Sequence, residues 1–230
     1  MSRPLVIFGS GEIASLAKYY FEADGGREVA AFTVDDAYAK DDTFEGRPLL
    51  AWSEAQARFS PAEADMHVAL SYQKLNRLRQ AKYEQAKAAG YTLASYVCSK
   101  ASVWPDLSHG DNCFILEDQV IQPTVTIGAN VMLWSGNHIG HGSHIGDHSY
   151  FASHVVVSGH CKIGQRCFFG VNATLRDFLT IGNDCFIAMD ASVAKDLSDG
   201  SVALTASSTL LDGDDPKAIK IRNRYFGLED

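Results

Sequence analysis

Six histidines crowd into a short stretch of this sequence, most of them within the segment WSGNHIGHGSHIGDH at 134–148. They are His138, His141, His144, His148, His154 and His160. Imidazole side chains at this density can bind a metal ion, transfer protons near neutral pH, or lie on the surface as solvated side chains. The fold that spaces them decides which chemistry is available.

The histidines belong to a six-residue repeat that spans 97–198. Seventeen hexads run from VCSKAS to VAKDLS without an insertion, and sixteen first positions are apolar, the exception being His109. Gly or Ala fills the second position in ten hexads. This pattern predicts a parallel β-helix in which each hexad makes one strand and one corner, and three hexads make a triangular coil. We expect the left hand, which is typical of hexapeptide repeats of this kind.

The cysteines fit the same repeat. There are five, without a CxxC pair, and an odd number in a cytoplasmic chain favours reduced thiols. Four of them occupy the fifth position of their hexads, which also holds Ala, Ser, Val and Leu, so we expect buried packing residues rather than a zinc cluster. These four are Cys113, Cys161, Cys167 and Cys185.

The first ninety-odd residues alternate strand-like and helix-like segments. LVIFGSGEIASLAKYYFEA predicts a strand, a glycine turn and a helix, while EVAAFTVDD, DMHVALS and YTLASYV predict three further strands. SEAQARF predicts a short helix, and QKLNRLRQAKYEQAKAAG a longer one that ends at Gly90. The expected organisation is an α/β half-Rossmann domain at 1–96, an all-β left-handed β-helix at 97–198 and a C-terminal tail at 199–230.

Charge and hydropathy limit the partners. The net charge of −8 over 230 residues argues against nucleic acid or an anionic membrane as a partner. No apolar run approaches the roughly 20 residues that cross a bilayer, and the short run LVIF before Gly9 is too brief for a signal peptide. We therefore expect a cytoplasmic protein.

The combination of a strand–GSG–helix unit with a hexapeptide β-helix resembles bacterial sugar acyltransferases of the sialic-acid O-acetyltransferase and bacillosamine-pathway N-acetyltransferase type. The resemblance covers about 5–198, and the tail from Asp199 departs from the Val-Gly-Val-Pro-Ala-like ending of that family. It implies transfer of an acyl group, expected to be acetyl, from coenzyme A to an amine or hydroxyl of a nucleotide-linked sugar for surface polysaccharide. It also implies a homotrimer with active sites between neighbouring β-helices. Because the spacing of the histidines does not bring them together within one chain, we expect no metal.

In that family the catalytic base is a histidine at the third position of a hexad, usually beside an acidic residue. The matching residue is His141, with His138 as its nearest competitor, and the next residue is Gly142 instead of Glu or Asp. A neutral imidazole suits proton removal from the attacking amine or hydroxyl near pH 7. A carboxylate that orients the base would have to come from another coil or subunit. The candidates are Glu117, Asp118 and Asp147.

The resemblance also assigns the ligand sites. It places the pantetheine arm of coenzyme A along a groove lined by main-chain groups of Tyr150, Val171 and Met189. GSGEIA at 9–14 is a G-x-G-x-x-A loop between a strand and a helix, where main-chain N–H groups and the helix dipole favour phosphate. The unit is too short for a complete dinucleotide fold, which favours a sugar nucleotide. The expected substrate-binding residues are Gly9, Ser10, Gly11, Asp35 and Asp36, with Ser71 and Gln73 as weaker candidates.

Three other functions remain open. The first is a zinc hydratase or hydrolase on a trimeric β-helix, like the gamma-class carbonic anhydrases. His148, His154 and His160 hold the fourth position of successive hexads, about 120° apart, so they do not converge within one chain, and no two histidines of the cluster are 18 residues apart. The second is a non-catalytic sugar-nucleotide-binding protein. The third is an NAD oxidoreductase, which lacks a second catalytic domain of the usual type.

Overall fold

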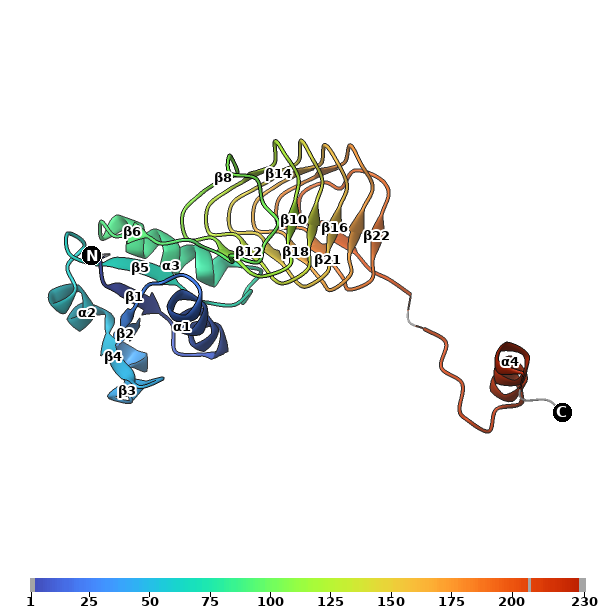
Figure 1. The fold of residues 1–230 in the computed structure, drawn as a ribbon, viewed down its shortest axis with the longest axis horizontal. Helices are drawn as coiled ribbons and strands as arrows, with labels where there is room; N and C mark the ends of the chain where they lie inside the picture. Colours follow the sequence, from blue (N-terminus) through green and yellow to red (C-terminus); the bar gives the residue numbers. More distant parts are fainter. Residues whose placement is uncertain (1–2, 207, 228–230) are drawn as a thin grey trace.

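The N-terminal part of the computed structural model, which describes residues 3–206 and 208–227, is a six-stranded sheet of order β3-β4-β2-β1-β5-β6 (Figure 1). Neighbouring strands are parallel except in the β3–β4 hairpin. Helices cover both faces, so β1 is buried along its whole length. The strands are β1 (Leu5–Phe8), β2 (Val29–Val34), β3 (Thr43–Phe44), β4 (Arg47–Ala51), β5 (Asp65–Val68) and β6 (Thr92–Leu93). The helices are α1 (Glu12–Ala23), α2 (Trp52–Arg58), α3 (Arg77–Ala88) and the 3-10 helix η1 (Asp36–Tyr38).

The expected α/β class is confirmed, with three local differences. The hairpin of β3 and β4 was not predicted, and it turns at Glu45 and Gly46, whose φ angles are 48° and 71°. Helix α3 begins later than expected because three consecutive residues, Lys74–Asn76, are left-handed and cannot continue an α-helix. The predicted strand YTLASYV is divided between the N-terminal sheet and the β-helix.

The second half is the predicted left-handed parallel β-helix of hexapeptide repeats. From β9 to β22 a two-residue strand begins every six residues, and strands 18 residues apart pair in register. We name its three sheets the docked, second and third faces. The docked face contains β7 (Tyr96–Val97), β9 (Phe114–Ile115), β12 (Met132–Leu133), β15 (Tyr150–Phe151), β18 (Phe168–Phe169), β21 (Phe186–Ile187) and β23 (Val202–Ala203). The second contains β10 (Val120–Ile121), β13 (His138–Ile139), β16 (Val156–Val157), β19 (Thr174–Leu175) and β22 (Ser192–Val193). The third contains β8 (Ser108–His109), β11 (Thr126–Ile127), β14 (His144–Ile145), β17 (Lys162–Ile163) and β20 (Thr180–Ile181).

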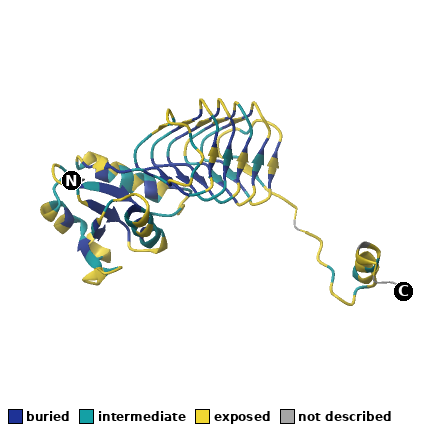
Figure 2. Ribbon diagram, viewed as in Figure 1, coloured by how far each residue is buried: buried dark blue, intermediate teal, exposed yellow. Residues whose placement is uncertain are grey.

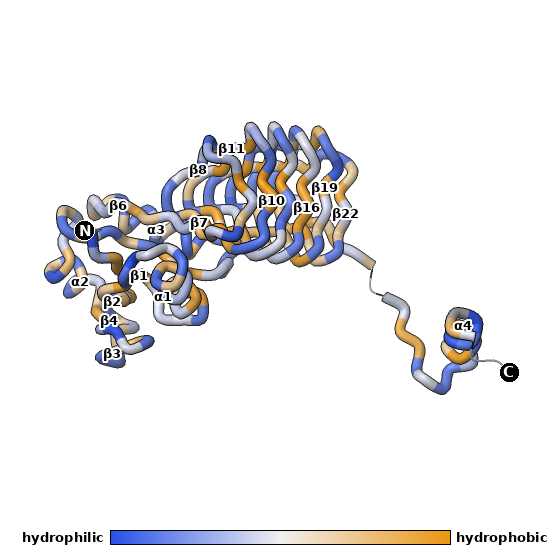
Figure 3. The backbone as a smooth tube through the Cα atoms, viewed as in Figure 1, coloured by the Kyte–Doolittle hydropathy of each residue, from blue (hydrophilic) through white to orange (hydrophobic). Residues whose placement is uncertain are grey.

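The interior of the coil is filled as the repeat predicts. First-position residues such as Ile139, Ile145 and Phe151 are fully buried in one continuous core, and Figure 3 shows hydrophobic colour recurring at successive strands. All four fifth-position cysteines are buried as free thiols in this core, which confirms their packing role. His109 breaks the rule because its strand lies in the first, incompletely enclosed coil, where its side chain is exposed.

From Asn112 to Asp190, each corner turns through one left-handed residue at the fourth position of its hexad, and these residues stack into three edges. The first, the Arg79 edge, contains Asn112, Asn130, His148, Arg166 and Asp184. The second, the Glu117 edge, contains Asp118, Gly136, His154, Asn172 and Asp190. The third, the His141 edge, contains Thr124, Gly142, His160 and Phe178.

The N-terminal domain packs on the docked face, which leaves the His141 edge, between the second and third faces, on the opposite side. Apolar side chains of α1, including Phe21, pack with Phe114 and Tyr150 of the docked face. In Figure 1 the domain lies beside β12 and β18, while the corner that leads into β14 forms part of the upper rim of the β-helix. Figure 2 shows corners along that rim as exposed.

A buried arginine joins the two domains. The guanidinium of Arg79, on α3, is 1% exposed and donates to the main-chain oxygens of Asn130, His148 (2.8 Å) and Ser149 (3.3 Å). It also donates to the side-chain oxygen of Asn76 at 2.9 Å. Burial lowers the pKa of Arg79 to about 10, so it remains a cation at neutral pH, held by carbonyl oxygens.

Beyond the β-helix, the chain continues as an exposed segment to helix α4 (Pro216–Phe226), which extends away from the coil in Figure 1. The Asp215 side chain caps this helix by accepting from the Lys217 N–H at 2.7 Å, and the left-handed Gly227 ends it. Within residues 3–206 and 208–227, no helix is long and apolar enough to span a bilayer.

Replacing Arg79 tests this interdomain contact. We expect Arg79→Met to lower the free energy of unfolding by about 3 kcal/mol or more, because it leaves several buried carbonyl oxygens without a donor. Denaturant unfolding measures the loss. Arg77→Met is the matched control: its side chain is 54% exposed and pairs with Asp184, so it should cost less than about 1 kcal/mol. Equal losses in the two variants would contradict a role for the buried guanidinium.

Candidate active site

The six clustered histidines are distributed over all three edges and two faces of the β-helix. His138 is half-buried on the second face, between Val120 and Val156, and His144 is exposed on the third face, 2.8 Å from Thr126 Oγ1. The fourth-position histidines lie on three different edges, as predicted. They are His148 on the Arg79 edge, His154 on the Glu117 edge and His160 on the His141 edge.

His148 is buried at the contact between the two domains. Its ring is 6% exposed and packs edge-on against Tyr83, and Nδ1 accepts from the side-chain amide of Asn130 at 2.9 Å. Burial, together with the charge of nearby Arg79, lowers the pKa of His148 to about 4. The ring is therefore neutral under physiological conditions and serves packing at the domain contact.

His141 is exposed and is held through one ring nitrogen. Its Nδ1 and its main-chain N both lie 2.8 Å from Oε1 of Gln122, one coil earlier. A main-chain N–H can only donate, so the facing atom must be the amide oxygen, and Nδ1 must then carry the ring proton. In the neutral ring this leaves Nε2 with a free lone pair. That is the arrangement of a general base.

A glycine leaves room beside the free nitrogen. A Cβ built on Gly159, in the next coil, would lie 3.1 Å from Nε2 and 3.0 Å from Cε1 of His141. Any larger residue at 159 would therefore crowd the side of the ring that carries Nε2. Sequence analysis did not single out Gln122 or Gly159, because neither residue type marks a catalytic position by itself.

The glycine after His141 has a packing explanation. A Cβ on Gly142, whose φ is 68°, would lie 2.5 Å from Nδ1 of His160. The His160 ring packs edge-on against His141, with ring centroids 4.8 Å apart, and stacks on Phe178 at 5.0 Å. The resembling family commonly has a carboxylate at the position of Gly142. In this chain the imidazole of His160, from the next coil, occupies that space.

The contact between His141 and His160 corrects one expectation. The spacing analysis counted only residues 18 apart as neighbours, whereas these two are 19 apart and touch across one corner. The pair is not a metal site by itself. Among the described residues there is no group of three or more His, Cys, Asp or Glu side chains with the geometry to hold a metal ion.

The three carboxylates considered as partners of the base lie elsewhere. Glu117 accepts from Tyr20 Oη and Ser135 Oγ, both at 2.8 Å, on the Glu117 edge, which Asp118 shares. Asp147 accepts from the main-chain N of Ala129 at 2.7 Å on the Arg79 edge. Within one chain, the partner of His141 is therefore the Gln122 amide.

The predicted sugar-nucleotide residues lie together at the carboxyl end of the N-terminal sheet. Gly9 directly follows β1 with φ 134°, and a Cβ there would lie 2.7 Å from the main-chain oxygen of Ala69, so the close approach to the end of β5 requires glycine. Ser10 and Gly11 are exposed and lead into α1. Ser71 and Gln73 follow β5 on the same edge.

Asp35 and Asp36 directly follow β2 at this edge and have protein partners. Asp36 accepts from the main-chain N–H and hydroxyl of Ser53 at 3.0 and 2.9 Å, and these bonds lower its pKa. Asp35 pairs with Lys82 Nζ at 2.5 Å, which also lies 5.5 Å from the centre of the Phe8 ring. Lys82 is thus a cation close to the glycine loop that sequence analysis missed, since a lysine on a polar helix gives no signal.

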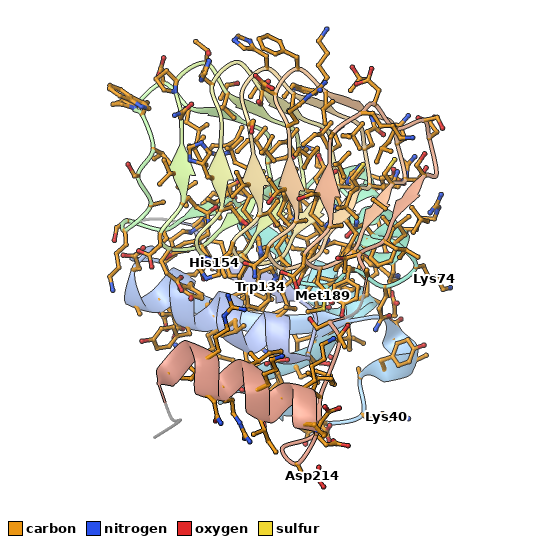
Figure 4. The ribbon with its side chains drawn as sticks, turned by 90° about the vertical axis from the view of Figure 1, so that its right-hand side faces the viewer. Lys40, Lys74, Trp134, His154, Met189 and Asp214 are labelled. Carbon is orange, nitrogen blue, oxygen red and sulfur yellow. The ribbon has the colours of Figure 1, made fainter. Side chains whose placement is uncertain are left out.

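The three positions assigned to coenzyme A are separate from His141 within one chain. Tyr150 is buried on the docked face, with its main-chain N bonded to Cys167 O at 2.8 Å. Val171 and Met189 are 41% and 60% exposed on the Glu117 edge, and Figure 4 shows His154 and Met189 along the lower side of the β-helix. A site that uses both these positions and His141 requires two chains.

The fold and this edge define a class: hexapeptide-repeat β-helix proteins with an N-terminal α/β domain. Residues 124–159 match the family described as bacterial transferase hexapeptide (six repeats). No curated protein matches the chain significantly.

Solved structures extend the likeness to almost the whole chain. The acetyltransferase domain of PglB from Neisseria gonorrhoeae, in complex with acetyl coenzyme A, has a TM-score of 0.78 and 21% identity, covering 90% of this chain and 100% of that one. PerB from Caulobacter crescentus, in complex with CoA and GDP-perosamine, has a TM-score of 0.78 and 24% identity, covering 89% and 97%. WeeI from Acinetobacter baumannii has a TM-score of 0.75 and 17% identity, covering 91% and 100%. The resemblance is confirmed at the level of the fold.

Adding a side chain at 142 tests the packing explanation. We expect Gly142→Asp to lower the free energy of unfolding by about 1–3 kcal/mol, because the new side chain meets the His160 ring. In the His160→Gly background the same change should cost at least about 1 kcal/mol less, as a double-mutant cycle in denaturant would show.

The Glu117 edge supplies a matched control, since a Cβ on Gly136 would lie 2.5 Å from His154 Nδ1 in the same arrangement. Gly136→Asp should couple to His154→Gly in the same way. Additive effects of Gly142→Asp and His160→Gly would contradict the packing explanation.

Proposed function

We propose that this protein transfers an acyl group, acetyl in the simplest case, from coenzyme A to a nucleotide-linked sugar. The single observation that carries the proposal is the state of His141. Its Nδ1 proton is held by Gln122, its Nε2 has no hydrogen-bond partner among the residues that the structure describes, and the ring lies on an exposed edge of a fold shared with structures that contain acetyl coenzyme A or CoA.

The reaction requires one general base, and it neither consumes nor releases a proton overall. The sugar amine or hydroxyl attacks the thioester carbonyl carbon and gives its proton to Nε2 of His141. When the tetrahedral intermediate collapses, the carbon–sulfur bond breaks, and the imidazolium returns the proton to the leaving thiolate. The products are the acylated sugar and coenzyme A as a free thiol.

The arrangement of the domains favours a homotrimer with shared sites. The glycine loop of the N-terminal domain lies on the side of the docked face, whereas His141 occupies the opposite edge of the same β-helix. A substrate held by that loop therefore meets the His141 of another chain. We propose that Val171 and Met189 of the Glu117 edge also face a neighbouring His141 edge and line the groove for the pantetheine arm, with Tyr150 behind them.

In this proposal the two domains have different roles. Residues 1–96 hold the sugar nucleotide, with its pyrophosphate at Gly9–Gly11 and its nucleoside toward Asp35 and Asp36, while Lys82 adds a positive charge. Residues 97–198 carry out acyl transfer, and residues 199–230 form a tail. PerB is crystallised with GDP-perosamine, which supports an amino sugar as the acceptor. We further propose a place in surface-polysaccharide synthesis. His138, half-buried on the second face, is the weaker candidate for the base.

Replacing the base tests the proposal. We expect His141→Ala to lower kcat by about 10²–10⁴-fold, since it removes general-base catalysis while leaving the substrate contacts in place. Release of the coenzyme A thiol from acetyl-CoA, with a panel of nucleotide-linked amino sugars, measures turnover. His109→Ala, an exposed histidine of the first coil, should retain full activity. Wild-type turnover by His141→Ala would remove His141 from the mechanism.

A further inference from the structure

The partner of His141 is an unusual residue for its place in the repeat. Gln122 holds the second position of its hexad, which is Gly or Ala in ten of the seventeen hexads. The long side chain extends along the His141 edge into the next coil, where its amide oxygen accepts from both the Nδ1 and the main-chain N of His141. Because the Nδ1–H and the main-chain N–H of His141 donate to the same oxygen, both the orientation and the tautomer of the ring are fixed.

We infer that Gln122 is the positioning residue for the catalytic base, and that a neutral amide does here what a carboxylate does in the resembling family. This inference rests on the proposed function of His141. The space for a carboxylate at 142 is taken by the His160 ring, and Glu117 and Asp147 have partners on other edges. Gln122 is therefore the group left to orient the ring.

A neutral partner suits the proposed ligands. Coenzyme A and a sugar nucleotide both carry phosphates, and both must approach the exposed His141 edge. A carboxylate beside His141 would add negative charge to a site that binds two anions, whereas an amide oxygen holds the Nδ1 proton without a net charge. The Gln122 amide therefore orients the His141 ring without adding negative charge to the site where the two anionic ligands bind.

The proton balance is compatible with this arrangement. Nε2 takes the proton of the attacking group, so the ring becomes an imidazolium whose Nδ1–H still donates to Gln122. The proton then leaves from Nε2 to the sulfur atom of coenzyme A. The ring returns to its starting tautomer without any proton moving through Gln122.

The first test measures the tautomer without any substrate. In a two-bond proton–nitrogen correlation spectrum of isotope-labelled histidine, neutral His141 of the wild type should show a protonated Nδ1 and an unprotonated Nε2. The spectrum of His141→Asn assigns the signals. In Gln122→Leu, which keeps the bulk but removes the acceptor, we expect a mixture of both tautomers. Gln165→Leu, an exposed glutamine on the Arg79 edge, should leave the His141 signals unchanged.

The second test separates positioning from binding. Gln122→Leu should lower kcat about 10-fold or more while KM for both substrates stays within about twofold, because the base is misoriented and the ligand contacts remain. Gln122→Glu should restore kcat and move the acid limb of the pH–rate profile upward by about 1 unit, since a carboxylate favours the imidazolium. A purely structural role for Gln122 would not predict that Glu restores kcat where Leu does not, at unchanged KM.

The other titratable groups near His141 are present in all these variants, so their effects cancel when the pH–rate profiles are compared. His160 contacts the ring, His138 and His144 lie on the flanking strands, and Asp177 forms a 4.0 Å pair with Arg176 farther along the edge. Wild-type kcat and an unchanged tautomer in Gln122→Leu would overturn the inference. If the tautomer changes but wild-type protein transfers no acyl group, the positioning role stands and the proposed function fails.

Discussion

A buried cation held by main-chain and side-chain amide oxygens fixes the relation between the two domains. The guanidinium of Arg79 is enclosed where α3 meets the Arg79 edge, and it donates to main-chain oxygens of two successive coils. Those oxygens converge because the left-handed corners at Asn130 and His148 stack in register. A charged group in this environment is tolerated only when several acceptors surround it. The contact sets which face of the β-helix is covered, and consequently which edge remains open.

The open edge carries the proposed base. His141 lies opposite the covered face, so the residues that hold its ring come from the β-helix alone: Gln122 from the coil before, and Gly159 and His160 from the coil after. A rigid stack of coils keeps these distances short without a contribution from mobile loops. It also separates His141 from the glycine loop of its own chain. This separation is the structural reason for proposing a site between subunits.

The repeat made most of the β-helix predictable, because an apolar residue every sixth position fixes strand, corner and face at once. It predicted that Ile139 and Cys161 are buried and that His148, His154 and His160 lie on three different edges, and the structure confirms both. Contacts that depend on side-chain reach were not predictable in this way. Gln122 touches His141 only because its side chain spans the rise between coils, and His160 contacts His141 across a spacing of 19 residues.

The N-terminal domain was predictable in class but not in detail. The alternation of strands and helices gave the parallel sheet, and GSGEIA located its glycine loop. The left-handed run at Lys74–Asn76 and the burial of Arg79 had no signal, since both depend on the β-helix against which the segment packs. The contact of Lys82 with Asp35 was not predicted either, because a lysine on a polar helix gives no signal in the sequence.

Subunit mixing tests the central claim, a His141-dependent acyl transfer completed by a second chain. His141→Ala lacks the base, while Gly11→Asp places a carboxylate in the glycine loop, where a Cβ meets nothing within 4 Å and the exposed residue begins α1. Each variant alone should be inactive in the coenzyme A release assay. When the two are mixed by co-expression or by refolding together, about a quarter of the sites combine an intact base with an intact loop from another chain, and about a quarter of wild-type activity should return. Inactive mixtures, from variants that assemble normally, would contradict a site shared between chains.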